Sequence, residues 1–257
     1  MKSILFLITG FKRGGAETQI SILSHKLLDL NYKVSLVIIG SYIEYKFDNK
    51  SGKMSRRDLK IIKHLTAFGI RGRKCLDVCP GTGRWLNFFK QHQASYIAGI
   101  DISQEALKKC SPLCDKIQRV DVEKEKFDFE SDYFDVVTSF MVLEHIRDPE
   151  LYISEIIRVC KNNALLLMTI PNIVSLVSRI RVLCGFVPQA ISSDKTHIKF
   201  YTKKELINLF RPFDQVPILH PTSFSLNPFN SHSLRIPSNN FTKSLDDHLL
   251  FSIKVKK

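Results

Sequence analysis

The stretch that decides the fold is CLDVCPGTGRW, residues 75–85. It opens with an apolar run that contains one acid, Asp77, and then breaks into a loop with Pro80, Gly81 and Gly83. A short apolar run bounded by proline and glycine indicates a buried strand. Glycines directly after a strand let the backbone approach a ligand closely, so we expect a binding site at the end of this strand.

Segments of strand and helix character alternate on both sides of this stretch. Strands are predicted over 74–78, 96–100, 117–120, 134–140 and 164–170, with further extended runs near 214–219 and 248–255. Helices are predicted over 58–68, 84–92, 104–111, 150–160 and near 173–184, and a capping box at Thr202 and Glu205 starts another. This alternation predicts an α/β fold: a Rossmann-like, mostly parallel sheet sandwiched by helices, with an antiparallel C-terminal edge.

The first forty residues form a separate block. ILFLIT and VSLVII are strand-like runs, and a glycine turn and a segment with helical apolar spacing lie between them. A partial βαβ unit is therefore predicted over 1–40. Residues 41–57 are polar and aperiodic and are interpreted as a linker, which leaves 58–257 as the main domain.

The composition is that of a globular protein with a basic surface. The chain has 257 residues, 44% of them hydrophobic, and a formal net charge of +13. Its lysines are spread along the chain rather than gathered in one run, which favours a solvated surface over a nucleic-acid-binding patch. We find no apolar segment long enough to span a bilayer and no convincing secretory leader, so a cytoplasmic location is expected.

The six cysteines are expected to be reduced thiols. Two C-x-x-x-C pairs, Cys75 with Cys79 and Cys110 with Cys114, lack the usual spacing of zinc ligands. No third cysteine follows either pair closely, as an iron–sulfur site requires. The cysteines therefore predict no metal site.

Four motifs in a fixed order carry a resemblance over residues 58–257: the loop at 75–85, AGIDIS at 98–103, DV at 121–122 and FDVVTSFMVLEHIRDP at 134–149. Together they resemble a class I S-adenosylmethionine-dependent methyltransferase of the small-molecule branch with a V-L-E-H signature. The resemblance implies S-adenosylmethionine as the cofactor and methyl transfer as the activity. The loop lacks the continuation of a dinucleotide-binding fingerprint, which argues against a dehydrogenase.

By this resemblance the loop holds the methionine and ribose part of the cofactor. Gly81 and Gly83 match the last two glycines of the family's G-x-G-x-G pattern, and Asp77 is expected near the methionine ammonium. Cys79 stands where the family has its first glycine. Its small side chain is expected to fit if its φ is negative.

The later motifs imply the rest of the cofactor site. Asp101, followed by Ile102, is expected to accept both ribose hydroxyls. Asp121 is expected to accept from the adenine amino group and the Val122 N–H to meet the ring, although a plain solvated position is the alternative for Asp121. Phe140, at the end of the fourth strand of the domain, completes the predicted cofactor-binding residues.

Two histidines are the candidate catalytic residues. His145 follows the 134–140 strand and is either a general base beside the transferred methyl or a packed strand-end residue. His197 lies in a segment that resembles the family's H-(I/V)-x-F-(F/Y)-T on the acceptor side, and its alternative role is a loop brace. Some relatives bind a divalent metal with E-x-x-E-H, but Met141 takes the first position here, so no metal is predicted.

Residues 172–189 combine apolar spacing with Arg179 and Arg181. By resemblance this segment is a lid over the acceptor pocket, and peripheral contact with a membrane is the alternative.

The first forty residues resemble the opening of family 4, GT-B type glycosyltransferases, with RGGAE at 13–17 as the matching run. Only the first βαβ unit is present, and one such unit cannot bind a sugar nucleotide or bury its own faces. We therefore expect no glycosyl transfer. The fragment suggests a surface-glycan context, by analogy alone.

The predicted function is methyl transfer to a small-molecule or glycan acceptor, at oxygen. One alternative is a nucleic-acid methyltransferase, which the net charge of +13 supports but the absence of an N/D-P-P-Y/F motif and of an RNA-binding module opposes. The other is a non-catalytic copy that retains the fold, which Cys79 in the loop keeps open. The acceptor and the oligomeric state are not predicted.

Overall fold

The chain divides into two compact units, Met1–Met54 and Ser55–Lys257. The computed structural model describes residues 3–8, 33–38, 44–46, 55–192, 194, 196–225, 235–240 and 242–257. Side chains in the first unit and at 224, 225 and 235 are outside this description.

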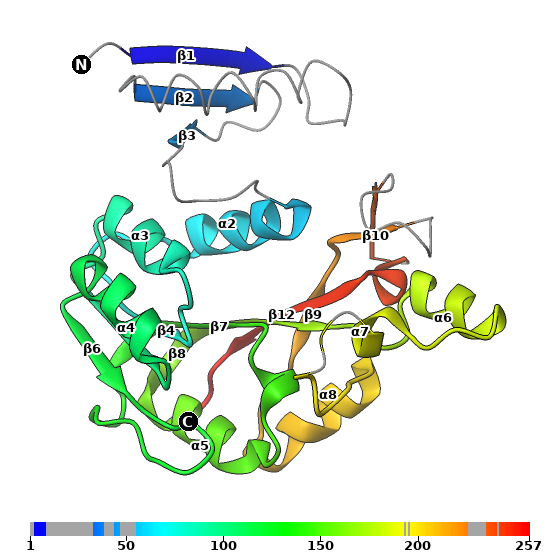
Figure 1. Ribbon diagram of the computed structural model, residues 1–257. Coiled ribbons are helices and arrows are strands. Elements are labelled where there is room, and N and C mark those ends of the chain that lie inside the picture. The colour runs from blue at the N-terminus through cyan, green and yellow to red at the C-terminus, as the bar shows by residue number, and fades with distance from the viewer. Residues whose placement is uncertain are drawn as a thin grey trace. The chain divides into compact units, whose positions relative to one another are not determined.

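The first unit contains a three-stranded sheet (Figure 1). Its strands are β1 (Ser3–Ile8), β2 (Lys33–Ile38) and β3 (Glu44–Lys46). β1 and β2 pair in parallel, as a βαβ unit requires, and β3 pairs antiparallel to β2. The helix predicted between β1 and β2 lies outside the described residues. The segment 41–57, interpreted as a linker, contains β3 and the first two residues of the next helix.

The second unit is built on a seven-stranded sheet of order β6-β5-β4-β7-β8-β12-β9. Its strands are β4 (Lys74–Val78), β5 (Tyr96–Asp101), β6 (Lys116–Arg119), β7 (Phe134–Phe140), β8 (Cys160–Pro171), β9 (Ile218–His220) and β12 (His248–Lys254). Pairs from β6 through β8 are parallel, and β12 is antiparallel to both of its neighbours. The predicted fold class is confirmed, with the antiparallel strand one position in from the edge.

Helices cover both faces of this sheet, with α2 and α3 on one face and α5 and α8 on the other (Figure 1). They are α2 (Arg56–Phe68), α3 (Arg84–Gln91), α4 (Gln104–Cys110), α5 (Pro149–Val159), α6 (Leu176–Leu183), α7 (Gln189–Ser192) and α8 (Lys203–Phe210). Short 3₁₀ turns occur at Ser111–Leu113, Leu143–His145, Arg211–Phe213 and Lys243–Leu245. In the part of the chain that the structure describes, none of the helices has the length and apolar character to cross a bilayer.

Side-chain caps set where two of the helices begin. Thr202 and Glu205 form the predicted capping box of α8. A second box, formed by Ser55 and Asp58, starts α2 two residues earlier than predicted. A serine followed three residues later by an acid satisfies two of the N–H groups that a helix start leaves unpaired, so the start of α2 was readable from the sequence.

The central strands are buried on both faces. Val136 and Val137 of β7 and Leu166 and Leu167 of β8 have no exposed surface. Successive strand residues point to opposite faces, so such consecutive burial requires helices on each side. The extended run predicted near 214–219 is shorter than expected, because the Arg211–Phe213 turn precedes it and β9 begins only at Ile218.

A small antiparallel pair, β10 (Ser223–Ser225) and β11 (Arg235–Pro237), precedes β12. Asp246 anchors this region. Its Oδ2 accepts hydrogen bonds from the Thr222 N–H at 2.7 Å and the Ser238 hydroxyl at 2.8 Å, and the residue is fully buried.

We predict that Asp246→Ala destabilises the chain by about 2 kcal/mol, because it leaves buried donors that had bonded a carboxylate without an acceptor. Denaturant unfolding measures this change. Asp246→Asn is the matched control: it retains one acceptor oxygen, so its loss should be smaller. Equal losses for the two variants would show that the hydrogen bonds are not the cause.

Candidate functional site

The carboxyl ends of four neighbouring parallel strands bring the predicted cofactor residues to one edge of the sheet. Asp77 lies near the end of β4, Asp101 ends β5, Asp121 follows β6 and Phe140 ends β7. Because β6, β5, β4 and β7 are adjacent and parallel, these residues lie side by side. Ligands bind at this edge in open α/β sheets.

The loop after β4 contains three residues in the left-handed region: Cys79 at φ +56°, Gly81 at +55° and Gly83 at +78°. The cysteine was expected to fit if its φ were negative, and its φ is positive. The turn places the Cys79 N–H 2.8 Å from the Ile100 carbonyl, and it holds Cys79 in the glycine-like conformation. Such a conformation costs a residue with a side chain roughly 1–2 kcal/mol, so the loop holds this turn under strain.

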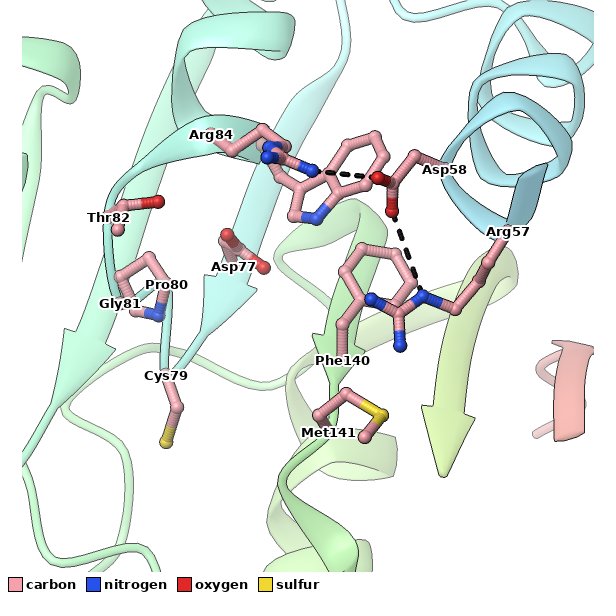
Figure 2. A pocket seen from close by; sticks show the side chains of 11 residues that line it. Arg57, Asp58, Asp77, Cys79, Pro80, Gly81, Thr82, Arg84, Phe140 and Met141 are labelled. Atoms are coloured by element: carbon pink, nitrogen blue, oxygen red, sulfur yellow. Dashed lines mark hydrogen bonds and ion pairs between the residues drawn. The ribbon is translucent and has the colours of Figure 1, made fainter. Parts of the chain in front are cut away.

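The Cys79 side chain packs against the hydrophobic core. In Figure 2 its sulfur points away from Asp77 and Arg84. Burial raises the pKa of the thiol, and the carboxylates of Asp101 and Asp77 raise it further. The side chain is therefore a neutral, packed thiol rather than a nucleophile.

A cavity of about 220 Å³ opens between the loop and the ends of β4 and β7 (Figure 2). Its lining residues are Arg57, Asp58, Asp77, Cys79, Pro80, Gly81, Thr82, Arg84, Trp85, Phe140 and Met141. Small-molecule sites typically enclose about 300–1,000 Å³. A cavity of this size accommodates one end of a larger ligand.

Asp77 presents an unsatisfied carboxylate oxygen in this cavity. Its Oδ1 accepts from the Thr138 hydroxyl at 2.7 Å, and Oδ2 is buried without a hydrogen-bond partner among the described residues. Burial raises the pKa of Asp77 to about 7, the Thr138 hydrogen bond lowers it, and the Asp101 carboxylate raises it. A bound cation would satisfy the free oxygen and favour the ionised acid.

The opposite side of the cavity is cationic. The Arg84 guanidinium lies 2.8 Å from Asp58 Oδ2, and Arg57 Nε lies 3.7 Å from Asp58 Oδ1. Gly83 caps α3 without a side-chain acceptor for the first N–H groups of the helix. A helix start of this kind favours an anion. An ammonium at Asp77 and a carboxylate near α3 are the two charges of an amino acid, so these residues fit the methionine end of S-adenosylmethionine.

Arg57, Asp58, Arg84 and Trp85 were missed by the sequence reading. Trp85 stacks obliquely on Phe140, with ring centroids 5.0 Å apart, and both residues line the cavity. No motif marks the two arginines, and Arg57 was assigned to the linker. Trp85 was within the quoted stretch, but its burial on α3 depends on contacts with another strand.

The other predicted cofactor residues lie along the same edge but outside the lining of this cavity. Asp101 is buried, and its Oδ1 accepts from the Ser103 N–H at 2.9 Å. Ile102 is 51% exposed, which leaves an apolar surface beside Asp101. Val122 is buried. The Asp121 carboxylate pairs with Lys124 at 3.0 Å, so its adenine role and its solvated alternative both stay open.

A second cavity of about 90 Å³ adjoins the first, and Met141 lines both. Its other lining residues are Pro171, Asn172, Ser175, Ser178, Gln189, Ala190, His197, Asp247 and His248. Met141 itself has φ +59°, another left-handed residue at the site. Backbone strain of this kind is typical of functional sites. Met141 therefore marks the place where the two cavities come together.

His197 faces this second cavity with a defined orientation. Its Nδ1 lies 2.7 Å from the Ala190 carbonyl, which requires the Nδ1 proton and leaves Nε2 as the acceptor. His197 Nε2 lies 4.0 Å from Glu144 Oε1. Glu144 is buried with both carboxylate oxygens unpartnered among the described residues, and burial raises its pKa to about 7. His197 Nε2 also lies 3.9 Å from Oδ2 of the exposed Asp194. The nitrogen left without a proton therefore faces two carboxyl groups, one of them buried.

His145 is oriented by the same loop but lines neither of these two cavities. Its Nδ1 lies 3.1 Å from the Thr196 carbonyl, and its ring centroid lies 4.9 Å from that of His197. One donor atom from each of Glu144, His145 and His197 lies within 4.8 Å of the others, a spacing that suits a metal ion. The sequence predicted no metal, because Met141 replaces the first acid of the E-x-x-E-H pattern. The absence of a metal stays a prediction.

Comparison with known proteins places this site in a family. A family model described as a methyltransferase domain matches residues 52–214. The chain belongs to this methyltransferase family. It is an enzyme with S-adenosylmethionine as its cofactor, and the first cavity fits one end of that molecule.

The chain is also similar to a curated relative from Cereibacter sphaeroides, named phosphatidylethanolamine N-methyltransferase. It is 29% identical over 125 residues, which cover 45% of this chain. The chain spans 58% of that relative's length.

Solved methyltransferase structures share the fold at low identity. One from Archaeoglobus fulgidus is 19% identical with a TM-score of 0.58, over 78% of this chain and 94% of that one. One from Mesorhizobium loti is 14% identical with a TM-score of 0.57, over 78% and 98% of the two chains. The magnesium protoporphyrin IX methyltransferase of Synechocystis, solved with bound SAH, is 12% identical with a TM-score of 0.55, over 80% and 90%.

We predict a large effect for one substitution in the loop and a small effect for another. In Gly83→Ala, a Cβ would lie 2.6 Å from Leu113 Cδ1 at φ +78°, so the variant should lose about 1–3 kcal/mol of stability through overpacking and strain. Its cofactor affinity should fall at least tenfold, about 1.4 kcal/mol. Denaturant unfolding and calorimetry measure the two quantities.

Cys79→Gly is the matched comparison. Relief of about 1–2 kcal/mol of strain is offset by the greater backbone entropy of glycine and by lost packing, so stability should change by less than about 1 kcal/mol. Cofactor affinity should change by less than about threefold, under 1 kcal/mol. A tenfold tighter complex would show that the cysteine obstructs the cofactor.

We predict that Asp77→Asn stabilises the fold while it weakens cofactor binding. The folded-state pKa of Asp77 is raised to about 7 from 3.8. The folded protein therefore takes up a proton between these values, and its stability falls as the pH rises through them. The variant should gain about 1–3 kcal/mol over the native chain at pH 8 and less at pH 5, as measured by denaturant unfolding at both pH values.

In the same Asp77→Asn variant, cofactor affinity should fall at least tenfold, about 1.4 kcal/mol, because the charge that meets the ammonium is lost. Thr138→Val is the control. It removes the hydroxyl that stabilises the carboxylate and should therefore shift the pH dependence of cofactor binding upward rather than abolish binding. Unchanged affinity in Asp77→Asn would remove Asp77 from the cofactor site.

Proposed function

We propose that the enzyme transfers the methyl group to a hydroxyl of a small-molecule or glycan-linked acceptor, with His197 as the proton acceptor. The observation that carries this proposal is that His197 lines the second cavity, with its Nε2 4.0 Å from Oε1 of the buried Glu144, and that Met141 lines both cavities. What we propose is that the methyl group goes to oxygen and that the acceptor is of this class. The methyl-transfer activity itself follows from the family.

Bound S-adenosylmethionine supplies an electrophilic methyl group on a positively charged sulfur. In the proposed reaction the acceptor oxygen forms a bond to this methyl as the carbon–sulfur bond breaks, and the bonding electrons leave with sulfur. The acceptor proton passes to His197 Nε2. Positioning and exclusion of water contribute the rest of the catalysis.

Glu144 supports the proton transfer in this proposal. Its carboxylate lies 4.0 Å from His197 Nε2, and ionisation of Glu144 would stabilise the imidazolium that forms. The Ala190 carbonyl holds the tautomer that leaves Nε2 able to accept. His145, the first candidate base from the sequence, lines neither of the two cavities and is proposed to orient the loop through Thr196.

A second acceptor class is an amine. The name of the Cereibacter sphaeroides relative, phosphatidylethanolamine N-methyltransferase, favours it. An ammonium must also lose a proton before it attacks, so the same His197 geometry serves it. The nucleic-acid alternative rests on the charge of +13 alone. Family membership leaves the non-catalytic alternative without support.

The remaining predictions from the sequence are untested. They are the division into domains at 1–40, 41–57 and 58–257, the resemblance of the first block to a glycosyltransferase fragment, the glycan context and the cytoplasmic location. We retain them as proposals, with the glycan context as the reason to begin an acceptor screen with sugars.

We predict that His197→Asn lowers kcat by about 10²–10⁴ for a hydroxyl acceptor, the range for loss of a general base. Transfer of a labelled methyl group to a panel of sugars, sugar nucleotides, RNA and phosphatidylethanolamine vesicles identifies an acceptor and then measures kcat. Affinity for S-adenosylmethionine should not change. His145→Asn is the matched control, with a loss below about tenfold. The reverse order of the two losses would assign the base to His145.

A further inference from the structure

Six successive residues at the end of α6 are exposed and apolar or small: 182–187, VLCGFV. Leu183 is 87% exposed, and Val182, Phe186 and Val187 are each more than half exposed. We call these four side chains the apolar ridge. Runs of three or four exposed apolar residues are uncommon in a soluble domain unless they have a function.

The ridge belongs to an ordered turn. α6 buries Val177 and Ser178 in its first turn and carries the ridge at its opposite end. The helix ends at Leu183, and Gly185 follows with φ +80°. The Phe186 N–H then donates to the Arg181 carbonyl at 2.8 Å, and Arg181 Nε donates to the Val187 carbonyl at 2.9 Å. The backbone therefore fixes the ridge in its exposed position.

Figure 1 shows α6 at the periphery of the second unit, beyond the end of the sheet. Ile191 and Ile198, in the segments that follow, are 40% and 45% exposed and extend the apolar surface. Of the nine large apolar residues with exposed side chains among those described, six lie between 182 and 198. The exposure is therefore concentrated in one region instead of being scattered over the molecule.

The charges beside the ridge are basic. Arg179 is exposed, and the Arg181 guanidinium carbon lies 5.8 Å from the centre of the Phe186 ring. The sequence has no acidic residue from 172 through 193, and the chain as a whole carries +13. Apolar side chains flanked by arginines are typical of segments that lie in the interface of an anionic membrane, because the apolar groups enter the lipid while the cations meet its phosphates.

The ridge lies on the elements that line the second cavity. Ser178 of α6 and Gln189 and Ala190 of α7 contribute to that lining. A lipid surface in contact with the ridge would therefore lie close to the cavity that His197 lines. An acceptor group attached to a lipid would reach this cavity without leaving the interface.

We propose that the apolar ridge docks the enzyme on an anionic lipid surface and that its acceptor is carried by a lipid. The lipid-borne acceptor rests on the proposed function; the docking surface does not. This assigns the segment 172–189 a membrane contact in place of the lid that the resemblance implied.

The test is flotation of the full chain with vesicles of phosphatidylcholine, with and without added phosphatidylglycerol. The native chain should bind the vesicles that contain phosphatidylglycerol and release them as salt is raised, since screening weakens the contact of arginines with phosphates. The double variant Leu183→Ser and Phe186→Ser should bind at least tenfold more weakly. Arg179→Gln should reduce the binding and its salt dependence.

Val216→Ser combined with Ile218→Ser is the matched control, because these residues are 69% and 56% exposed outside this region. It should bind vesicles as the native chain does. Loss in the control equal to that in the ridge variant would overturn the proposal, as would a native chain that does not bind. A dimer that forms without lipid and that only the ridge variant abolishes would instead assign the ridge to self-association.

Two further measurements separate this proposal from the proposed function. The ridge variant should bind S-adenosylmethionine with native affinity, which also shows that it is folded. His197→Asn should bind vesicles as the native chain does. Vesicle binding without methyl transfer to any lipid would keep the docking surface and overturn the lipid-borne acceptor.

Discussion

The hydrogen bond between the Thr138 hydroxyl and Asp77 Oδ1, 2.7 Å long, links the two central strands at the point where the cofactor site begins. It satisfies one oxygen of a buried carboxylate and leaves the other facing the cavity. Burying a carboxylate with one oxygen unpaired is unfavourable unless a cation joins it. The site is therefore built around an acid whose preferred charge state depends on the ligand, and the loop, α3 and the arginines are arranged about it.

Two non-glycine residues with left-handed backbone lie beside the first cavity. Cys79 and Met141 both have positive φ, one at the exit of β4 and the other at the exit of β7. Neither residue type favours that conformation, and each costs roughly 1–2 kcal/mol. The surrounding sheet supplies the stability that holds them. Their conformations let the backbone turn sharply at the two strand ends, and both residues line the first cavity.

The second cavity, which we propose takes the acceptor, has a different construction. Its cavity takes residues from β7's exit, the end of β8, α6, α7 and the start of β12, with no single motif contributing most of the lining. His197 is held by Ala190 on one side and faces Glu144 on the other. Most of this lining comes from helices and connecting segments, which in proteins of one fold carry much of the functional variation.

The sequence by itself determined most strands of the seven-stranded sheet, most helix limits, the α/β class and the loop with its glycines, because each depends on residues close together along the chain. The capping boxes at Thr202 and Ser55 belong to the same group. The sequence did not indicate β3, β10 or β11. The tertiary structure decided the positive φ of Cys79, the cationic side formed by Arg57 and Arg84, and the approach of His197 to Glu144. It also decided which apolar residues of 172–189 are buried and which form the ridge. These features depend on the order of strands in the sheet and on which connections cover its edge, and the spacing of residues along the chain does not encode that order.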